Sequence, residues 1–146
     1  MAKDLFDQVV KDALIKDGWN ITHDPFPVDY TDHRKMEKIS NYRQIIQDIL
    51  TAHSEIQPAY GEIEMGLLFD TVRDRYQVIR AGWLQKKRVY GVLIDIDLKG
   101  KTIWIQYDGT EVGVANELVD RGIPKEDIVL AYHSKFIRQY DGFAVG

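Results

Sequence analysis

Between residues 62 and 108 the sequence forms four successive stretches of strand-like alternation, joined by short polar links. The stretches read "EIEMGLLFD", "RYQVIRAGW", "RVYGVLIDIDLK" and "KTIWIQYD". Links of about two to five residues are too short for the crossover that parallel neighbours require. The four strands are therefore predicted to pair in sequence order as an antiparallel meander.

Helical patterns flank these strands. One begins at Met36 and ends near His53, and a shorter one after the fourth strand is closed by Gly122, with Pro124 beyond. Their apolar positions are Ile39, Tyr42, Ile46, Ile49 and Leu50 in the first and Val114, Leu118 and Val119 in the second. We therefore predict an α+β fold, a four-stranded antiparallel meander with helices packed on one face. Residues 127–134, "DIVLAYHS", are a candidate edge strand.

An extra helix is predicted at the N-terminus. Its apolar stripe lies between Asp4 and Asp17 and consists of Phe6, Val9, Val10, Ala13 and Leu14. A helix of about 14 residues is marginal alone in water. We expect it to dock on the rest of the chain or on a second copy, which would make a homo-oligomer.

The amino-acid composition argues against several classes of function. The 146 residues are 45% hydrophobic, enough for one core, and the net charge of −4 provides no strong field toward nucleic acids. The absence of cysteine excludes disulfides, thiol nucleophiles and Cys-based zinc sites. Because no apolar run approaches the roughly 18 residues of a membrane helix, we expect no membrane partner and a cytoplasmic protein.

The segment "DIDLK" is the strongest candidate for catalysis. Asp95, Asp97 and Lys99 share one strand face, and Asp74 is expected near Asp97 across the second and third strands. Asp74, Asp97 and Lys99 together could hold Mg²⁺ as in a nuclease. Alternating acidic and apolar residues are also ordinary in a half-exposed strand, and we favour this explanation.

Other chemical signals are weak. "QKKR" at residues 85–88 could touch phosphates, but a solvated turn explains it as well. No histidine pair has metal-ligand spacing among His23, His33, His53 and His133. "GTEVG" lacks the lysine of a phosphate loop, and Asp108 or Thr110 can instead cap the helix that follows. We predict no catalytic residue, no metal and no cofactor.

The C-terminal segment combines charged residues with Tyr132, Phe136, Tyr140 and Phe143. Aromatic rings with arginine are typical of protein interfaces, although rings here could equally close the core. Our candidates for partner contact are Lys125, Glu126, Arg138 and Tyr140.

A family resemblance covers most of the chain. "NYRQIIQDIL", "YGEIEMGLLFDTVRDRYQVIRAGW" and especially "IWIQYDGTEVGVANELVDRGIPKEDIVLAYHS" resemble the XisI family of excision controlling factors, over residues 36–146. Residues 1–28 resemble the opening of XisH, the partner factor, and 29–35 would be a linker left by a fusion or an internal deletion. The XisH family resembles restriction endonucleases, but its metal-binding sheet has no counterpart here, so this fragment should have no nuclease activity.

The resemblance implies a non-enzymatic accessory factor in developmental site-specific DNA excision, the heterocyst-type rearrangement of cyanobacteria. It would act by binding an XisH-type protein and would associate only indirectly with a site-specific recombinase and DNA. Two alternatives stay open, a Mg²⁺-dependent nuclease using Asp74, Asp97 and Lys99, and an inhibitor of a nuclease partner. The N-terminal helix could also occupy, within the chain, the surface that the intact partner binds.

Overall fold

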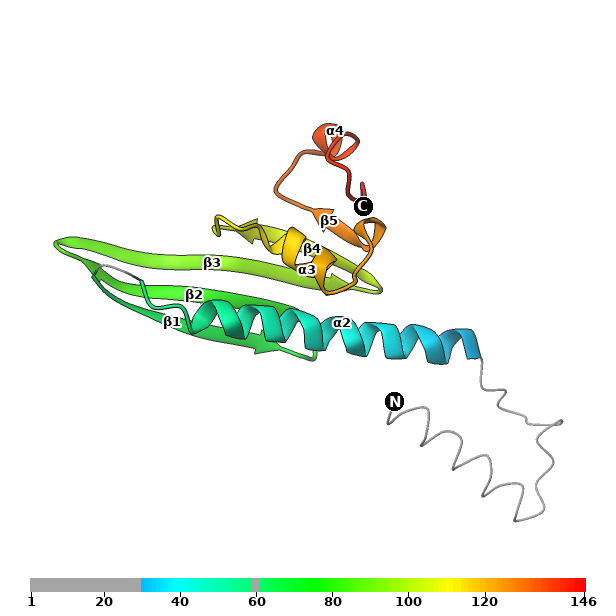
Figure 1. Cartoon of the computed structure of the whole chain (residues 1–146), viewed down its shortest axis with the longest axis horizontal. Helices are drawn as coiled ribbons and strands as arrows, with labels where there is room; N and C mark the ends of the chain where they lie inside the picture. Colours follow the sequence, from blue (N-terminus) through cyan, green and yellow to red (C-terminus); the bar gives the residue numbers. More distant parts are fainter. Residues whose placement is uncertain (1–29, 59–60) are drawn as a thin grey trace, which may run out of the picture. The chain divides into compact units, whose positions relative to one another are not determined.

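The computed structural model describes residues 30–58 and 61–146 (Figure 1). The chain divides between Asn41 and Tyr42 into two units, and each is described by itself. The helix predicted between Asp4 and Asp17 lies outside the described residues.

The long helix α2 runs from Tyr30 to Ser54. It confirms the helix predicted after Met36, but it begins earlier, so residues 30–35 of the expected linker are helical. In the second unit its apolar stripe lies in the core, with Tyr42, Ile46, Ile49 and Leu50 all buried. Helical periodicity alone therefore identified which face of α2 packs.

The four predicted strands form a meander in sequence order, and each consecutive pair is antiparallel. They are β1 (Glu62–Asp70), β2 (Arg75–Leu84), β3 (Lys87–Lys99) and β4 (Thr102–Asp108). A fifth strand, β5 (Ile128–Leu130), pairs parallel to β4 at the far edge. The sheet is therefore mixed rather than purely antiparallel, because the chain between β4 and β5 is long enough to cross back over it.

That crossover contains the short helix α3 (Val114–Asp120) and the 3₁₀ turn η2 (Lys125–Asp127). The predicted cap is confirmed at Asp108, whose Oδ2 accepts the Val114 N–H at 2.8 Å. Gly122 follows α3 with φ +93°, the left-handed conformation that glycine adopts most readily. Beyond β5 the chain forms α4 (Lys135–Arg138).

Within the second unit, α3 and the part of α2 from Tyr42 onward cover the same face of the sheet (Figure 1). His53 of α2 approaches Glu117 of α3, with Nε2 and Oε2 2.6 Å apart. Opposite them the strands present their buried positions, which are Tyr76, Val78, Ile94, Ile96, Leu98, Ile103 and Ile105. We call this the helix face and the opposite side the outer face. Among the described residues, no helix has the length and apolar composition needed to cross a bilayer.

Candidate functional site

Residues 131–143 project from the sheet after β5 and return to its edge, and we call this segment the C-terminal loop. The Ala131 N–H donates to the Ile105 carbonyl at 2.9 Å as the loop leaves. The Ala144 N–H donates to the Ile128 carbonyl at 2.8 Å where it returns. The sheet therefore holds both ends of the loop.

Arg138 holds the loop from inside. Its guanidinium donates to the carbonyls of His133 at 2.9 Å, Ala131 at 3.2 Å and Val145 at 3.3 Å. It also lies 5.6 Å from the centre of the Trp104 ring, on the outer face of β4. One cation thus ties the start of the loop, the C-terminal segment and the sheet together.

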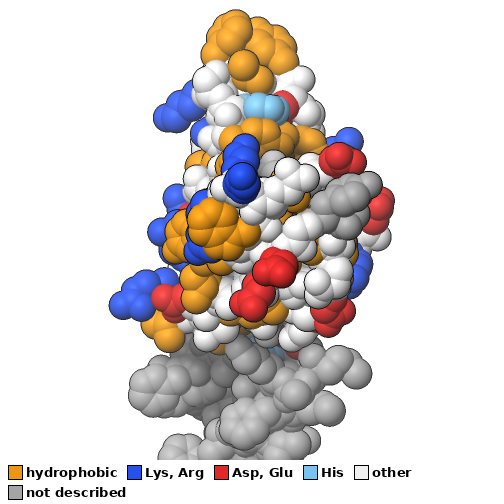
Figure 2. Space-filling model, turned by 90° about the vertical axis from the view of Figure 1, so that its left-hand side faces the viewer, with side chains coloured by type: hydrophobic (Ala, Val, Ile, Leu, Met, Phe, Trp, Pro, Cys, Tyr) orange, Lys and Arg blue, Asp and Glu red, His pale blue; other side chains and the backbone are white. Residues whose placement is uncertain are grey.

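The outside of the loop is apolar. Phe136 is 68% exposed and Tyr140 74%, and their rings meet edge to face with centroids 5.5 Å apart. The neighbouring Ile137 is also exposed, and we call Phe136, Ile137 and Tyr140 the aromatic cluster. Figure 2 shows a hydrophobic group at the top of the molecule, where Figure 1 places α4. Contiguous exposed apolar side chains on a fixed scaffold are typical of recognition surfaces.

The residues predicted for partner contact are distributed over two elements. Lys125 and Glu126 lie exposed in η2, and the Lys125 ammonium is 5.6 Å from the Phe143 ring. Tyr140 belongs to the aromatic cluster, but the guanidinium of Arg138 is used inside the loop. Arg138 therefore positions the cluster, and contact of all four residues with a partner stays a prediction.

The structure does not bring Asp74, Asp97 and Lys99 together, and the β2–β3 register is the reason. Arg75 is paired with Asp97, so Asp74 lies opposite Leu98, whose N–H donates to the Asp74 carbonyl at 2.9 Å. A shift of one residue places side chains on opposite faces of a sheet. The prediction that Asp74 lies beside Asp97 on one face is wrong.

Asp74 belongs to the helix face. Arg43 of α2 binds its carboxylate with two hydrogen bonds, Nε to Oδ1 at 2.6 Å and Nη2 to Oδ2 at 2.9 Å. The buried Tyr76 hydroxyl donates to Oδ1 at 2.7 Å. The hydrogen bonds from Arg43 hold the pKa of Asp74 below its usual range, while burial raises the pKa of Tyr76 to about 12. This arrangement fixes α2 on the β1–β2 turn.

Asp97 belongs to the outer face. Its Oδ1 accepts from Arg75 Nε at 2.9 Å and its Oδ2 from Gln106 Nε2 at 3.1 Å. Lys99 places its ammonium 4.6 Å from the Trp104 ring centre. In the part of the chain that the structure describes, no three acidic, histidine or cysteine side chains are grouped to hold a metal ion.

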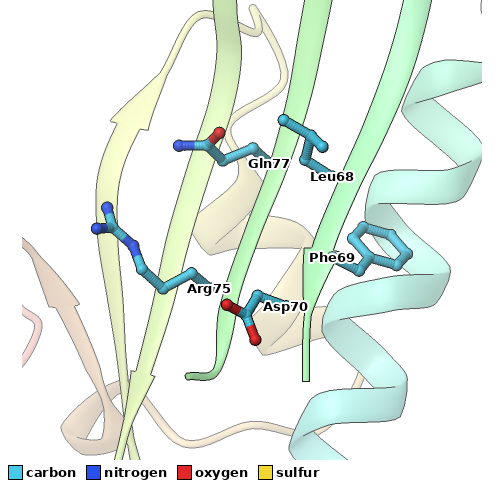
Figure 3. Close-up of a pocket in the computed structure, with 5 residues that line it drawn as sticks. All are labelled: Leu68, Phe69, Asp70, Arg75 and Gln77. Atoms are coloured by element: carbon cyan, nitrogen blue, oxygen red, sulfur yellow. The ribbon is translucent and has the colours of Figure 1, made fainter. Parts of the chain in front are cut away.

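A hollow of about 320 Å³ lies at the end of β1 and β2. Figure 3 shows Leu68, Asp70, Arg75 and Gln77 around it, with Phe69 pointing toward α2. Arg75 bridges it to the carboxylates of the outer face, because its Nη2 also lies 3.7 Å from Asp95 Oδ2. One oxygen of Asp95, Oδ1, is buried without a hydrogen-bond partner. Asp70 is the one carboxylate that lines the hollow among the described residues.

The "QKKR" segment forms the tight β2–β3 turn and the start of β3. Its Arg88 guanidinium lies 5.5 Å from the Trp83 ring and 5.7 Å from the Tyr90 ring. The prediction for this segment was a solvated turn with phosphate contact as the alternative, and it did not include the packing of Arg88 on the two rings. Trp83 and Tyr90 flank the turn at a spacing that would have indicated it.

Comparison with protein families gives two matches. Residues 36–145 match the model described as XisI protein, and residues 1–55 match the model described as XisH protein. The XisH match thus extends past residue 28 and overlaps the XisI match through most of α2. A search of the curated proteins found no match.

Two solved structures are similar to about three quarters of the chain. A XisI-like protein from Anabaena variabilis is 33% identical with a TM-score of 0.68, covering 74% of this chain and 99% of that chain. The fdxN element excision controlling factor XisI from Anabaena variabilis is 30% identical with a TM-score of 0.65, covering 75% and 99%.

Proposed function

Because the chain belongs to the XisI family, we propose that it is an accessory factor in the control of DNA excision that acts by binding an XisH-type protein. The observation that carries this proposal is the pair of matches, XisI over residues 36–145 and XisH over residues 1–55 of one chain. Joining two sequences in one chain raises their effective concentration and favours partners that associate. The name of the fdxN element factor supports the excision role.

On this proposal the protein acts by binding a partner and not by catalysing a reaction. The outer-face carboxylates Asp95 and Asp97 are already bound by Arg75, Gln77 and Gln106, and Asp74 is bound on the other face. A carboxylate with these partners is poorly placed to take up a divalent ion or a proton in a reaction. Association with a recombinase and DNA is then indirect, through the partner.

The aromatic cluster is the surface that we assign to the XisH-type partner. It offers two large rings and Ile137 without the cost of ordering a flexible segment, because the sheet and Arg138 already hold the loop. Lys125 and Glu126 on η2 supply polar contacts at its rim.

Isothermal titration of the full chain with an XisH-type protein tests the proposal. Tyr140→Ala should weaken binding at least tenfold, since a central exposed tyrosine at an interface is worth about 2 kcal/mol. Tyr90→Ala is the matched control, because Tyr90 is also 74% exposed but lies on β3. Absence of binding by the unaltered chain would refute the association. Equal affinity of both variants for the XisH-type protein would refute the aromatic cluster as the binding surface but would leave the association itself standing.

Two further measurements complete the test. The chain should show no Mg²⁺-dependent nicking of duplex DNA, and nicking that Asp97→Ala abolishes would refute the non-enzymatic reading. If residues 1–28 occupy the partner's surface, deletion of residues 1–30 should raise the affinity for the XisH-type protein. Unchanged or lower affinity would place that segment elsewhere.

A further inference from the structure

Among the residues that the structure describes, strand β1 is an edge of the sheet with one side unpaired. Among the described residues it pairs only with β2, whereas β5 forms the other edge. None of its nine residues, all within the described part of the chain, is buried. Leu67 on the helix face and Leu68 on the outer face are both exposed. A strand exposed at its edge and on both faces is a template for another strand.

The register tells which main-chain groups point outward. The Leu98 N–H donates to the Asp74 carbonyl, so even-numbered residues of β2 bond to β3 and odd-numbered ones to β1. Their partners in β1 are Glu62, Glu64, Gly66, Leu68 and Asp70. The main-chain groups of the residues between them, Ile63, Met65, Leu67 and Phe69, therefore point away from the sheet.

Charge on this edge argues against pairing with a second copy. β1 carries Glu62, Glu64 and Asp70 and no basic residue. Antiparallel self-pairing centred on Gly66 would place Glu62 beside the Asp70 of the other copy. In-register parallel pairing would place each acid beside itself. Like charges directly opposite destabilise a strand pair, so a basic segment fits this edge and the β1 of a second copy does not.

The hollow at the end of β1 adds a place for a basic side chain. The main-chain N–H groups of Val72 and Arg73 donate to Asp70 Oδ1, each at 3.0 Å, and the Arg73 main-chain bond is the main reason that the pKa of Asp70 is lowered. Asp70 thus stays charged. Arg75 is the one base lining the hollow among the described residues, and it is already shared by the carboxylates of Asp95 and Asp97. An added cation at the hollow would therefore meet the Asp70 carboxylate, whose Oδ2 also accepts from Arg73 Nη1 at 3.1 Å.

We propose that the β1 edge binds an extended segment of another protein with lysine or arginine at alternate positions, as a sixth strand of the sheet. Backbone hydrogen bonds to Ile63, Met65, Leu67 and Phe69 supply affinity. Glu62, Glu64 and the hollow beside Asp70 select the basic side chains. This surface lies at the opposite edge of the sheet from the C-terminal loop. The protein can therefore hold an XisH-type partner at one edge and a second, basic protein at the other.

Residue-resolved hydrogen exchange on the full chain tests this with a nine-residue peptide of alternating lysine and threonine. At saturation the amides of Ile63, Met65, Leu67 and Phe69 should exchange at least tenfold more slowly. Those of Glu64 and Leu68, already bonded to β2, should change little. Slowing without this alternation would mean side-chain docking only and would overturn the proposal. Equal binding of an alternating glutamate and threonine peptide would overturn the role of charge.

Variants separate this surface from its alternatives. Glu62→Lys with Glu64→Lys should weaken peptide binding at least tenfold. Glu111→Lys with Asp120→Lys, the same charge change at exposed positions elsewhere, should leave it within about twofold. Equal loss in both pairs would show a non-specific charge effect and overturn the proposal. Protection of the four outward amides by raised chain concentration alone, or by the XisH-type protein, would assign the edge to that occupant instead.

Discussion

Replacing Arg138 by alanine should release the C-terminal loop while leaving the sheet intact. The guanidinium satisfies carbonyls of Ala131, His133 and Val145, and alanine leaves all three without this donor. The ends of the loop stay bonded to Ile105 and Ile128. The expected result is therefore local opening rather than global unfolding.

The magnitude follows from these contacts. The bonds to His133 and Ala131 are partly buried and charge-assisted, worth about 1.5 kcal/mol each. The bond to Val145 is exposed and contributes little, while the contact with the Trp104 ring adds about 0.5–1 kcal/mol. Opening should become easier by about 3.5–4 kcal/mol, which is roughly a 400- to 900-fold increase in local exchange.

Amide hydrogen exchange measures this directly. The loop amides of Tyr140 and Phe143 should accelerate, because they donate inside the loop to the Ile137 carbonyl and to Asp141. The amide of Leu98, in the meander, serves as the reference and should not change. Lys135→Ala, at an exposed position on the same helix, is the control. Arg138→Lys should restore only part of the protection, because one ammonium cannot reproduce the planar fork.

Two results would refute the reasoning. If Arg138→Ala changes the exchange rates of the loop amides by less than about threefold, the three hydrogen bonds of Arg138 do not stabilise the loop. Equal acceleration of the loop and of Leu98 would mean that Arg138 stabilises the whole fold rather than the loop.

Three other predictions follow from the core. Asp74→Asn should lower the free energy of unfolding at pH 7 by about 1–2 kcal/mol. Because the folded pKa of Asp74 is depressed, its contribution to stability is present above the unfolded pKa of about 4 and disappears as the pH falls. Urea melts of the unaltered chain and the variant should therefore converge in acid. The folded pKa of Tyr76 is raised from 10.0 to about 12, so its contribution to stability is complete below pH 10 and is lost as the pH rises toward 12. Tyr76→Phe should therefore flatten the alkaline part of the curve of stability against pH. An unchanged slope would contradict this. Gly82→Ala should destabilise the chain by more than about 2 kcal/mol in thermal melts, since its Cβ would lie 1.9 Å from the Glu62 carbonyl oxygen, whereas Gly66→Ala, with nothing within 4 Å, should be nearly neutral; similar melting temperatures would refute the close approach of β1 and β2.

The candidate site shows where sequence reasoning was sufficient and where it was not. Tyr140 was predicted as a contact residue from composition and is exposed. Arg138 was predicted with it, but its role depends on three carbonyls that only the folded loop brings near. The β1 edge had no signal of its own in the sequence, because an edge strand and an inner strand share the same alternation.

The sequence alone determined the meander and the helix through Tyr42 to Leu50, and it narrowed the cap to Asp108 or Thr110, because each depends on local periodicity, short connections or turn chemistry. The tertiary structure decided the β2–β3 register, and with it the separation of Asp74 from Asp97 onto opposite faces. It also decided that β5 pairs parallel to β4 and that β1 is left at the edge. These features depend on which distant segments pack together, and a pairing shifted by one residue leaves the local pattern unchanged while it moves every side chain to the other face.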